Sequence, residues 1–193
     1  MVELDRFDNS WYHPGRSKFI QVLWFFFGLP ILRSPLLPSS AVRCRLLRLF
    51  GAQVGKGVVI KPGVRVKYPW LLSIGANSWI GEDCWIDNLA PVDIGRNVCV
   101  SQGVYFCTGN HNWSDPAFGL MVRPITLRDG CWVAAKAVLC PGIEIGECAV
   151  VGAGSVAIRD VPAYQIWTGN PAVFRKLRPL NQTSVADGGS STS

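Results

Sequence analysis

Residues 74–86 of this chain read IGANSWIGEDCWI, in which isoleucine recurs every six residues. A period of six does not match an amphipathic helix, whose face repeats every 3.6 residues. It matches a short strand followed by a tight turn, where glycine and asparagine accept the positive φ that sharp corners need. Three such hexads close one triangular coil, and stacked coils bury a continuous aliphatic column.

The same period extends over most of the chain. It continues at Val54, Ile60, Val66, Ile94, Val100, Phe106, Leu127, Val133, Leu139, Ile145 and Val151. Four positions beyond these residues stands a small or β-branched residue, as at Val58, Cys84 and Ala149. The period slips by two residues within 67–73 and 87–93, where we expect small bulges at a corner. The sequence therefore predicts an all-β fold, a parallel β-helix over residues 54–172.

Residues 1–53 form an extension without this period. The apolar stretch 19–32 predicts a helix that is bent or broken near Pro30. The stretch also contains Gln21 and is shorter than the roughly 20 residues that a spanning helix needs. We expect it to pack on the body or on a neighbouring subunit, with peripheral association at the membrane interface as the alternative. Mixed charge before the stretch argues against a signal peptide.

Composition and charge limit the remaining choices. A chain of 193 residues suits one domain rather than two. Its net charge of +6 suits an anionic membrane surface, a polyphosphorylated co-substrate or nucleic acid. Of these three, we do not expect nucleic acid as a partner. Seven cysteines without a CxxC pair favour a reduced, cytoplasmic setting, with contact at the inner face of the membrane left open. Residues 173–193 are expected to form a basic segment and a disordered tail.

The repeat is interrupted at length over residues 107–126, and a long loop in a compact solenoid is usually functional. This loop carries His111, one of two histidines in the chain. An imidazole can take a proton from a hydroxyl at neutral pH. Because His13 is the other histidine, the three-histidine zinc site of a γ-type carbonic anhydrase is excluded, and we expect no metal.

The loop and the coils that follow resemble a known group of enzymes. The run from Thr108 to His111, followed by Asp115-Pro116, is similar to the catalytic loop of the maltose and galactoside O-acetyltransferases. The segments 151–156 and 169–172 are similar to the closing coils and terminal turn of that group. A resemblance to the colanic acid biosynthesis acetyltransferase family covers nearly the whole chain and includes residues 8–12, 15–17, 49–52, 88–92 and 107–111.

The resemblance implies a left-handed β-helix, a homotrimer and O-acetyl transfer from acetyl-CoA to a sugar or glycan. His111 is then the general base, in direct transfer without an acyl-enzyme. The residues expected to contact acetyl-CoA are Trp132, Ala135, Ala153, Ile158, Arg159, Arg175 and Lys176. Acceptor contacts are expected at Asn88, Asn110 and Asp115. Main-chain N–H groups at Ala134 and Ala135 are candidates for the oxyanion.

Two alternatives stay open at this stage. A histidine base serves amines as well as alcohols, so the chain could be an N-acetyltransferase acting on an amino sugar. A catalytically silent β-helix that acts as a scaffold is the alternative from another class, and His111 argues against it. Binding of acetyl-CoA would discriminate between an enzyme and a scaffold.

Overall fold

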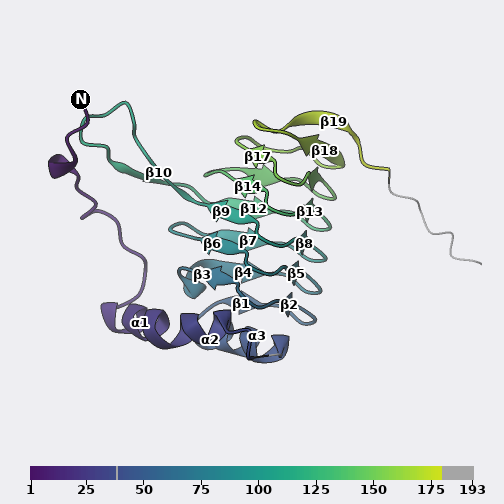
Figure 1. Cartoon of the computed structure of the whole chain (residues 1–193), viewed down its shortest axis with the longest axis horizontal. Coiled ribbons are helices and arrows are strands. Elements are labelled where there is room, and N and C mark those ends of the chain that lie inside the picture. Colours follow the sequence, from purple (N-terminus) through teal and green to yellow (C-terminus); the bar gives the residue numbers. More distant parts are fainter. Residues whose placement is uncertain (38, 180–193) are drawn as a thin grey trace, which may run out of the picture.

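The chain folds into a triangular solenoid of parallel strands with helices at one end, and the computed structural model describes residues 1–37 and 39–179 (Figure 1). Each coil contributes one strand to each of three sheets. Sheet 1 is built, in spatial order, from β1 (Gln53–Val54), β4 (Leu72–Ile74), β7 (Val92–Ile94), β12 (Ile125–Leu127) and β15 (Glu144–Ile145).

Sheets 2 and 3 follow the same stacking order. Sheet 2 contains β2 (Val59–Ile60), β5 (Trp79–Ile80), β8 (Cys99–Val100), β13 (Trp132–Val133), β16 (Val150–Val151), β18 (Gln165–Thr168) and β19 (Val173–Leu177). Sheet 3 contains β3 (Arg65–Val66), β6 (Trp85–Asp87), β9 (Tyr105–Cys107), β14 (Val138–Leu139) and β17 (Val156–Ala157). The predicted parallel β-helix is therefore confirmed.

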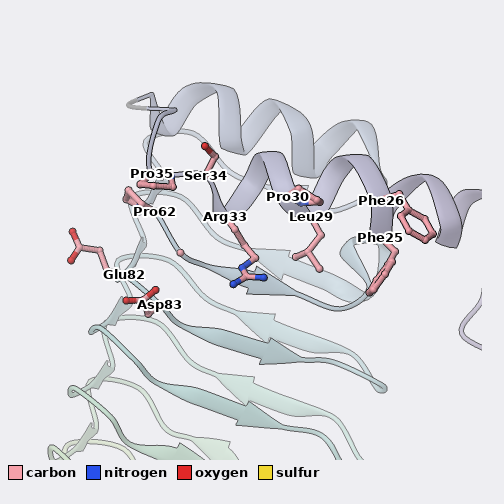
Figure 2. A pocket seen from close by; sticks show the side chains of 11 residues that line it. Phe25, Phe26, Leu29, Pro30, Arg33, Ser34, Pro35, Pro62, Glu82 and Asp83 are labelled. Atoms are coloured by element: carbon pink, nitrogen blue, oxygen red, sulfur yellow. The ribbon is translucent and has the colours of Figure 1, made fainter.

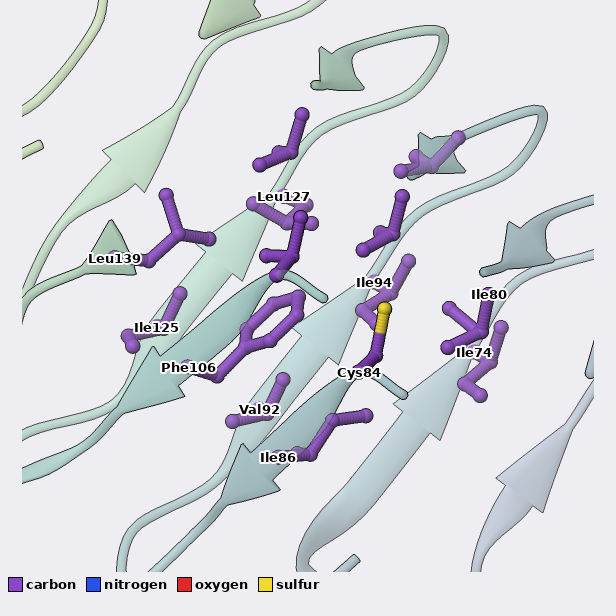
Figure 3. Packing of buried hydrophobic residues seen from close by; sticks show 14 of the residues in the cluster. Ile74, Ile80, Cys84, Ile86, Val92, Ile94, Phe106, Ile125, Leu127 and Leu139 are labelled. Carbon is purple, nitrogen blue, oxygen red and sulfur yellow. The ribbon is translucent and has the colours of Figure 1, made fainter. Parts of the chain in front are cut away.

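The residues that set the period form the buried column. Ile74, Ile80 and Ile86 are at most 3% exposed, and Figure 3 shows them stacked with the equivalent residues of neighbouring coils. The small residues four positions further on are buried too, including Cys84 and Ser78. Ser78 keeps its hydroxyl satisfied by donating to the carbonyl of Gly95 at 2.7 Å. Burial of each large aliphatic side chain contributes roughly 1.5–3 kcal/mol, so the column supplies most of the stabilisation.

Several polar residues of the repeat lie at the corners of the coils, where the chain turns sharply. Asn77, Asp83 and Asn97 adopt positive φ, which short polar residues accept more readily than branched ones. The two predicted slips lie at corners between sheets 3 and 1. The first contains a short 3₁₀ helix, η3 (Pro69–Leu71), and the second joins β6 directly to β7 through residues 88–91.

The N-terminal extension closes one end of the solenoid. One helical run consists of α1 (Lys18–Leu23), a π-helical turn η2 (Trp24–Gly28) and α2 (Leu29–Arg33), and α3 (Ser40–Leu49) follows. A 3₁₀ turn, η1 (Leu4–Arg6), lies near the N-terminus. The predicted irregularity precedes Pro30, because Pro30 itself stands in the first turn of α2. We call residues 18–49 the helical cap.

Two buried polar groups order the helical cap: one fixes it to the coils, and the other joins its helices. The indole N–H of Trp24 donates to the carbonyl of Val66 at 3.0 Å. Arg43 is 1% exposed, and its guanidinium donates to the carbonyls of Leu32 and Ser34 near the end of α2. Arg43 is therefore a buried helix-capping residue rather than a surface charge.

The other end of the solenoid closes with a hairpin. β18 pairs with β16 in parallel and with β19 in antiparallel register, so residues 173–177, which include Arg175 and Lys176, extend sheet 2. The expected disordered tail falls largely on residues 180–193, outside the described residues. Within the described part of the chain, no helix is long and apolar enough to cross a membrane.

Candidate active site

The long loop leaves the solenoid at the corner between sheets 3 and 1 as an antiparallel hairpin. Its strands are β10 (Gly109–His111) and β11 (Leu120–Val122), with His111 opposite Leu120. Thr108 fixes the base of the hairpin, because its buried hydroxyl donates to the carbonyl of Asp87 at 2.8 Å and accepts from the N–H of Ala90. The hairpin therefore starts from a rigid coil.

The ring of His111 is held by the turn of the hairpin. Its Nδ1 lies 2.9 Å from the carbonyl oxygen of Phe118. A carbonyl only accepts hydrogen bonds, so Nδ1 carries the proton and Nε2 keeps a free lone pair. The phenyl ring of Phe118 stacks on the imidazole, with ring centroids 4.4 Å apart and nearly parallel planes. This arrangement identifies the group that orients His111.

The turn itself has an uncommon backbone. Phe118 adopts a φ of +49°, a conformation that costs free energy for a bulky residue and that collects at functional sites. Asp115 supports this turn, because its carbonyl accepts from the N–H of Phe118 and its carboxylate accepts from the N–H of Ala117. Asp115, expected at the acceptor, thus shapes the loop that presents His111.

Residues from the far N-terminus cover the hairpin. The N–H of Glu3 donates to the carbonyl of Pro116 at 2.9 Å, and the ring of Phe7 lies 5.6 Å from that of His111. Figure 1 shows this segment running from the helical cap to the tip of the hairpin. Neither Phe7 nor Phe118 was singled out from the sequence, because their contacts with His111 depend on how the loop and the extension fold.

A pocket of about 350 Å³ lies between the hairpin and the coils behind it. Its lining consists of Asn110, Met121, Arg123, Cys140, Pro141 and Ile158. The pocket brings together Asn110, expected at the acceptor, and Ile158, expected at acetyl-CoA. The Asn110 side chain also accepts from the N–H of His111 at 2.8 Å. Arg159 follows Ile158 at the same corner and is exposed.

The other residues expected at acetyl-CoA lie on different faces. Trp132 stands on sheet 2, partly exposed, and its indole N–H donates to the hydroxyl of Ser101 at 2.9 Å. Ala135 and Ala153 lie at the corner between sheets 2 and 3, where their coils are neighbours. Arg175 and Lys176 are exposed on β19 at the end of the solenoid. One subunit therefore does not gather all these residues around His111.

Two expected roles do not fit the positions of the groups. Asn88 is completely buried, and its amide exchanges two hydrogen bonds with the backbone of Tyr68, at 2.9 and 2.7 Å. It stabilises the slipped corner and offers no surface to an acceptor. The N–H of Ala134 donates to the carbonyl of Val151 in the next coil, so this group is not free for an oxyanion.

Asp87 is a polar residue near the hairpin that sequence reasoning missed. Lys67 Nζ lies 3.0 Å from Oδ1, although not in hydrogen-bonding geometry, so Oδ1 is buried without a hydrogen bond. The hydroxyl of Tyr105 donates to Oδ2 at 3.3 Å. Burial raises the pKa of Tyr105, so the phenol stays protonated as a donor. The sequence could have indicated Asp87, because its carboxylate stands at an outward position of the repeat, one coil before the loop.

Comparison with known proteins places this site in context. Residues 71–106 match the family described as hexapeptide repeat of succinyl-transferase. The putative colanic acid biosynthesis acetyltransferase WcaF of Escherichia coli is 42% identical over 136 residues, which cover 70% of this chain and 75% of that protein. The galactoside O-acetyltransferase of Escherichia coli is 30% identical over 139 residues, covering 70% of this chain and 68% of that enzyme.

Solved structures share the fold. The hexapeptide-repeat acetyltransferase VCA0836 of Vibrio cholerae has a TM-score of 0.74 and 26% identity, covering 83% of this chain and 93% of that one. The same protein has been solved in complex with acetyl coenzyme A, and that structure has a TM-score of 0.76 and 24% identity, covering 84% of this chain and 88% of that one.

Proposed function

The chain belongs to the colanic acid biosynthesis acetyltransferase family of hexapeptide-repeat proteins, and we propose that it transfers an acetyl group from acetyl-CoA to a hydroxyl of a sugar or polysaccharide precursor. The observation that carries this proposal is the geometry of His111, whose Nδ1 is held by the Phe118 carbonyl while Nε2 keeps its lone pair. A base fixed in one tautomer is what proton removal from an alcohol requires.

The reaction follows from these groups. Nε2 of His111 takes the proton of the acceptor hydroxyl, and the oxygen attacks the thioester carbonyl of acetyl-CoA. The C–S bond of the tetrahedral intermediate then breaks, and the imidazolium returns the proton to the departing thiolate. The Phe118 carbonyl stabilises the imidazolium during the step, because its oxygen accepts from Nδ1–H in both protonation states. The acetyl group passes directly to the acceptor, so no covalent acetyl-enzyme intermediate forms.

The distribution of the expected acetyl-CoA contacts supports a homotrimer. His111 and Ile158 lie at the corner between sheets 3 and 1, whereas Trp132 lies on sheet 2. We propose that acetyl-CoA lies between two subunits, with the hairpin from one and sheet 2 from the next. Arg159, Arg175 and Lys176 then offer positive charge to its phosphates.

The acceptor side is proposed at the hairpin. Asn110 precedes His111 and Asp115 follows it by four residues, but both side chains support the loop in the described chain. Asp87, whose side chain is partly exposed and which lies next to the base of the hairpin, is a better candidate for contact with an acceptor hydroxyl. Cytoplasmic acetyl-CoA supplies the acetyl group.

A screen of acceptors tests the proposal. Release of coenzyme A thiol is measured with free glycans, nucleotide sugars, lipid-linked sugars and amino sugars, and binding of acetyl-CoA is measured separately by calorimetry. Transfer to a hydroxyl supports the proposal. Transfer confined to amino sugars would favour the N-acetyltransferase, and a protein that binds no acetyl-CoA would be the scaffold.

A further inference from the structure

The helical cap leaves a broad apolar surface uncovered. Phe19, Phe25, Phe26 and Phe27 are each more than 60% exposed, and Val22 and Ile31 add to the same helical run. Figure 2 shows Phe25 and Phe26 projecting from this run beside a pocket of about 830 Å³. Several large apolar side chains this exposed on one helix mark an interaction surface rather than the ordinary scatter of apolar residues.

The helical cap itself carries charge of one sign. All 13 acidic residues of the chain lie outside residues 9–81, although this segment includes the whole helical cap. Lys18, Arg33 and Arg45 are exposed on the cap helices. Glu82 and Asp83 line the pocket from the second coil, but the helices of the cap carry aromatic side chains and, among charged residues, cations only. Such helices complement a surface that is apolar inside and anionic outside.

We propose that the helical cap docks on an anionic lipid bilayer, with the run from Lys18 to Arg33 lying in the plane of the interface. The phenylalanine rings enter the boundary between headgroups and acyl chains, and Lys18, Arg33 and Arg45 contact the headgroups. The run is about 24 Å long, which is short of the roughly 30 Å hydrocarbon core, so it lies on the bilayer rather than across it.

Charge also argues for lipid over a second copy of the same surface. An isologous contact would bring two cationic helical caps together, and like charges facing each other weaken association. The affinity for an anionic bilayer instead increases with each cation of the helical cap. In a homotrimer with parallel solenoids, three caps would face the same membrane, and simultaneous contact would strengthen binding. The docking does not depend on the acetyl-transfer proposal.

Vesicle sedimentation tests the docking with the full chain. Vesicles of phosphatidylglycerol and phosphatidylcholine in equal parts are compared with vesicles of phosphatidylcholine alone, at low and high salt. The test variants are Phe26→Ser with Phe27→Ser, and Lys18→Gln with Arg45→Gln. The matched control is Phe174→Ser, because Phe174 is also exposed but lies on β19 at the opposite end of the solenoid.

We expect the wild-type chain to bind the anionic vesicles and to be released by salt. Each double variant should bind on the order of tenfold more weakly, and Phe174→Ser should bind like the wild type. Equal binding by all variants would overturn the proposal. If the wild-type chain ignored vesicles and Phe26→Ser with Phe27→Ser lost its oligomeric state in light scattering, the surface would be a contact between copies, and the proposal would fail.

Discussion

Replacing His111 with asparagine removes the proposed base while keeping the loop. An asparagine amide can still donate to the carbonyl of Phe118, but it has no lone pair that takes a proton near neutral pH. The hairpin lies outside the buried column, so the substitution removes no core contact. We therefore expect catalysis and folding to respond very differently.

The expected magnitudes differ by several kilocalories per mole. Loss of a positioned general base lowers kcat by about 10² to 10⁴, which corresponds to roughly 3–5 kcal/mol in the barrier. The lost stacking on Phe118 costs about 0.5–1.5 kcal/mol, and it concerns the hairpin alone. Affinity for acetyl-CoA should stay within about twofold, because the imidazole acts on the acceptor proton.

The assay needs one confirmed acceptor and a matched control. Initial rates of coenzyme A release are measured for the wild type, His111→Asn and His13→Asn, together with acetyl-CoA affinity and thermal unfolding. His13 is the other histidine of the chain and is exposed. Wild-type turnover by His111→Asn across the pH range would refute the assignment of the base.

Three further outcomes are expected. Arg159→Ala should raise the KM for acetyl-CoA about tenfold with a smaller effect on kcat, as steady-state kinetics would reveal, because phosphate binding is remote from the reacting carbonyl. Gly28→Ala should lower the free energy of unfolding in urea by about 2 kcal/mol, because a Cβ there would clash with the ring of Trp24; unchanged stability would contradict the packing. Alkylation of the native protein near neutral pH should label the exposed Cys99 but not Cys131, whose thiol has its pKa raised to about 12 by burial, and peptide mapping would reveal labelling of the wrong residue.

The solenoid was predictable because its information is local and repeated. Each hexad carries its own inward residue and its own turn, so the period at Ile74, Ile80 and Ile86 identifies the core without reference to distant segments. The helical stretch 19–32 was likewise evident from its composition. Its π-helical turn was not, because that turn accompanies the packing of Trp24 on the coils.

The site was predictable only in part, because much of it depends on contacts between segments far apart in sequence. The break in the period pointed to His111, but the carbonyl of Phe118 that holds it comes from the turn of the hairpin, and the ring of Phe7 reaches it from the N-terminus. Asn88, in contrast, was expected at the acceptor but has a structural role. An asparagine at a slipped corner suits either a ligand or a buried backbone partner, and only the position of Tyr68 decides for the second.

The triangular coil also limits what one subunit can do. Three sheets point in three directions, so a residue on sheet 2 and a hairpin at the corner between sheets 3 and 1 cannot enclose the same ligand within one copy. Trp132 and His111 stand in this relation, although the resemblance assigned both to one reaction. If both serve that reaction, the wall opposite His111 must come from another subunit. The proposed homotrimer is then required for catalysis. A separated subunit would keep His111 but lose the side of the acetyl-CoA groove that sheet 2 of the next subunit supplies.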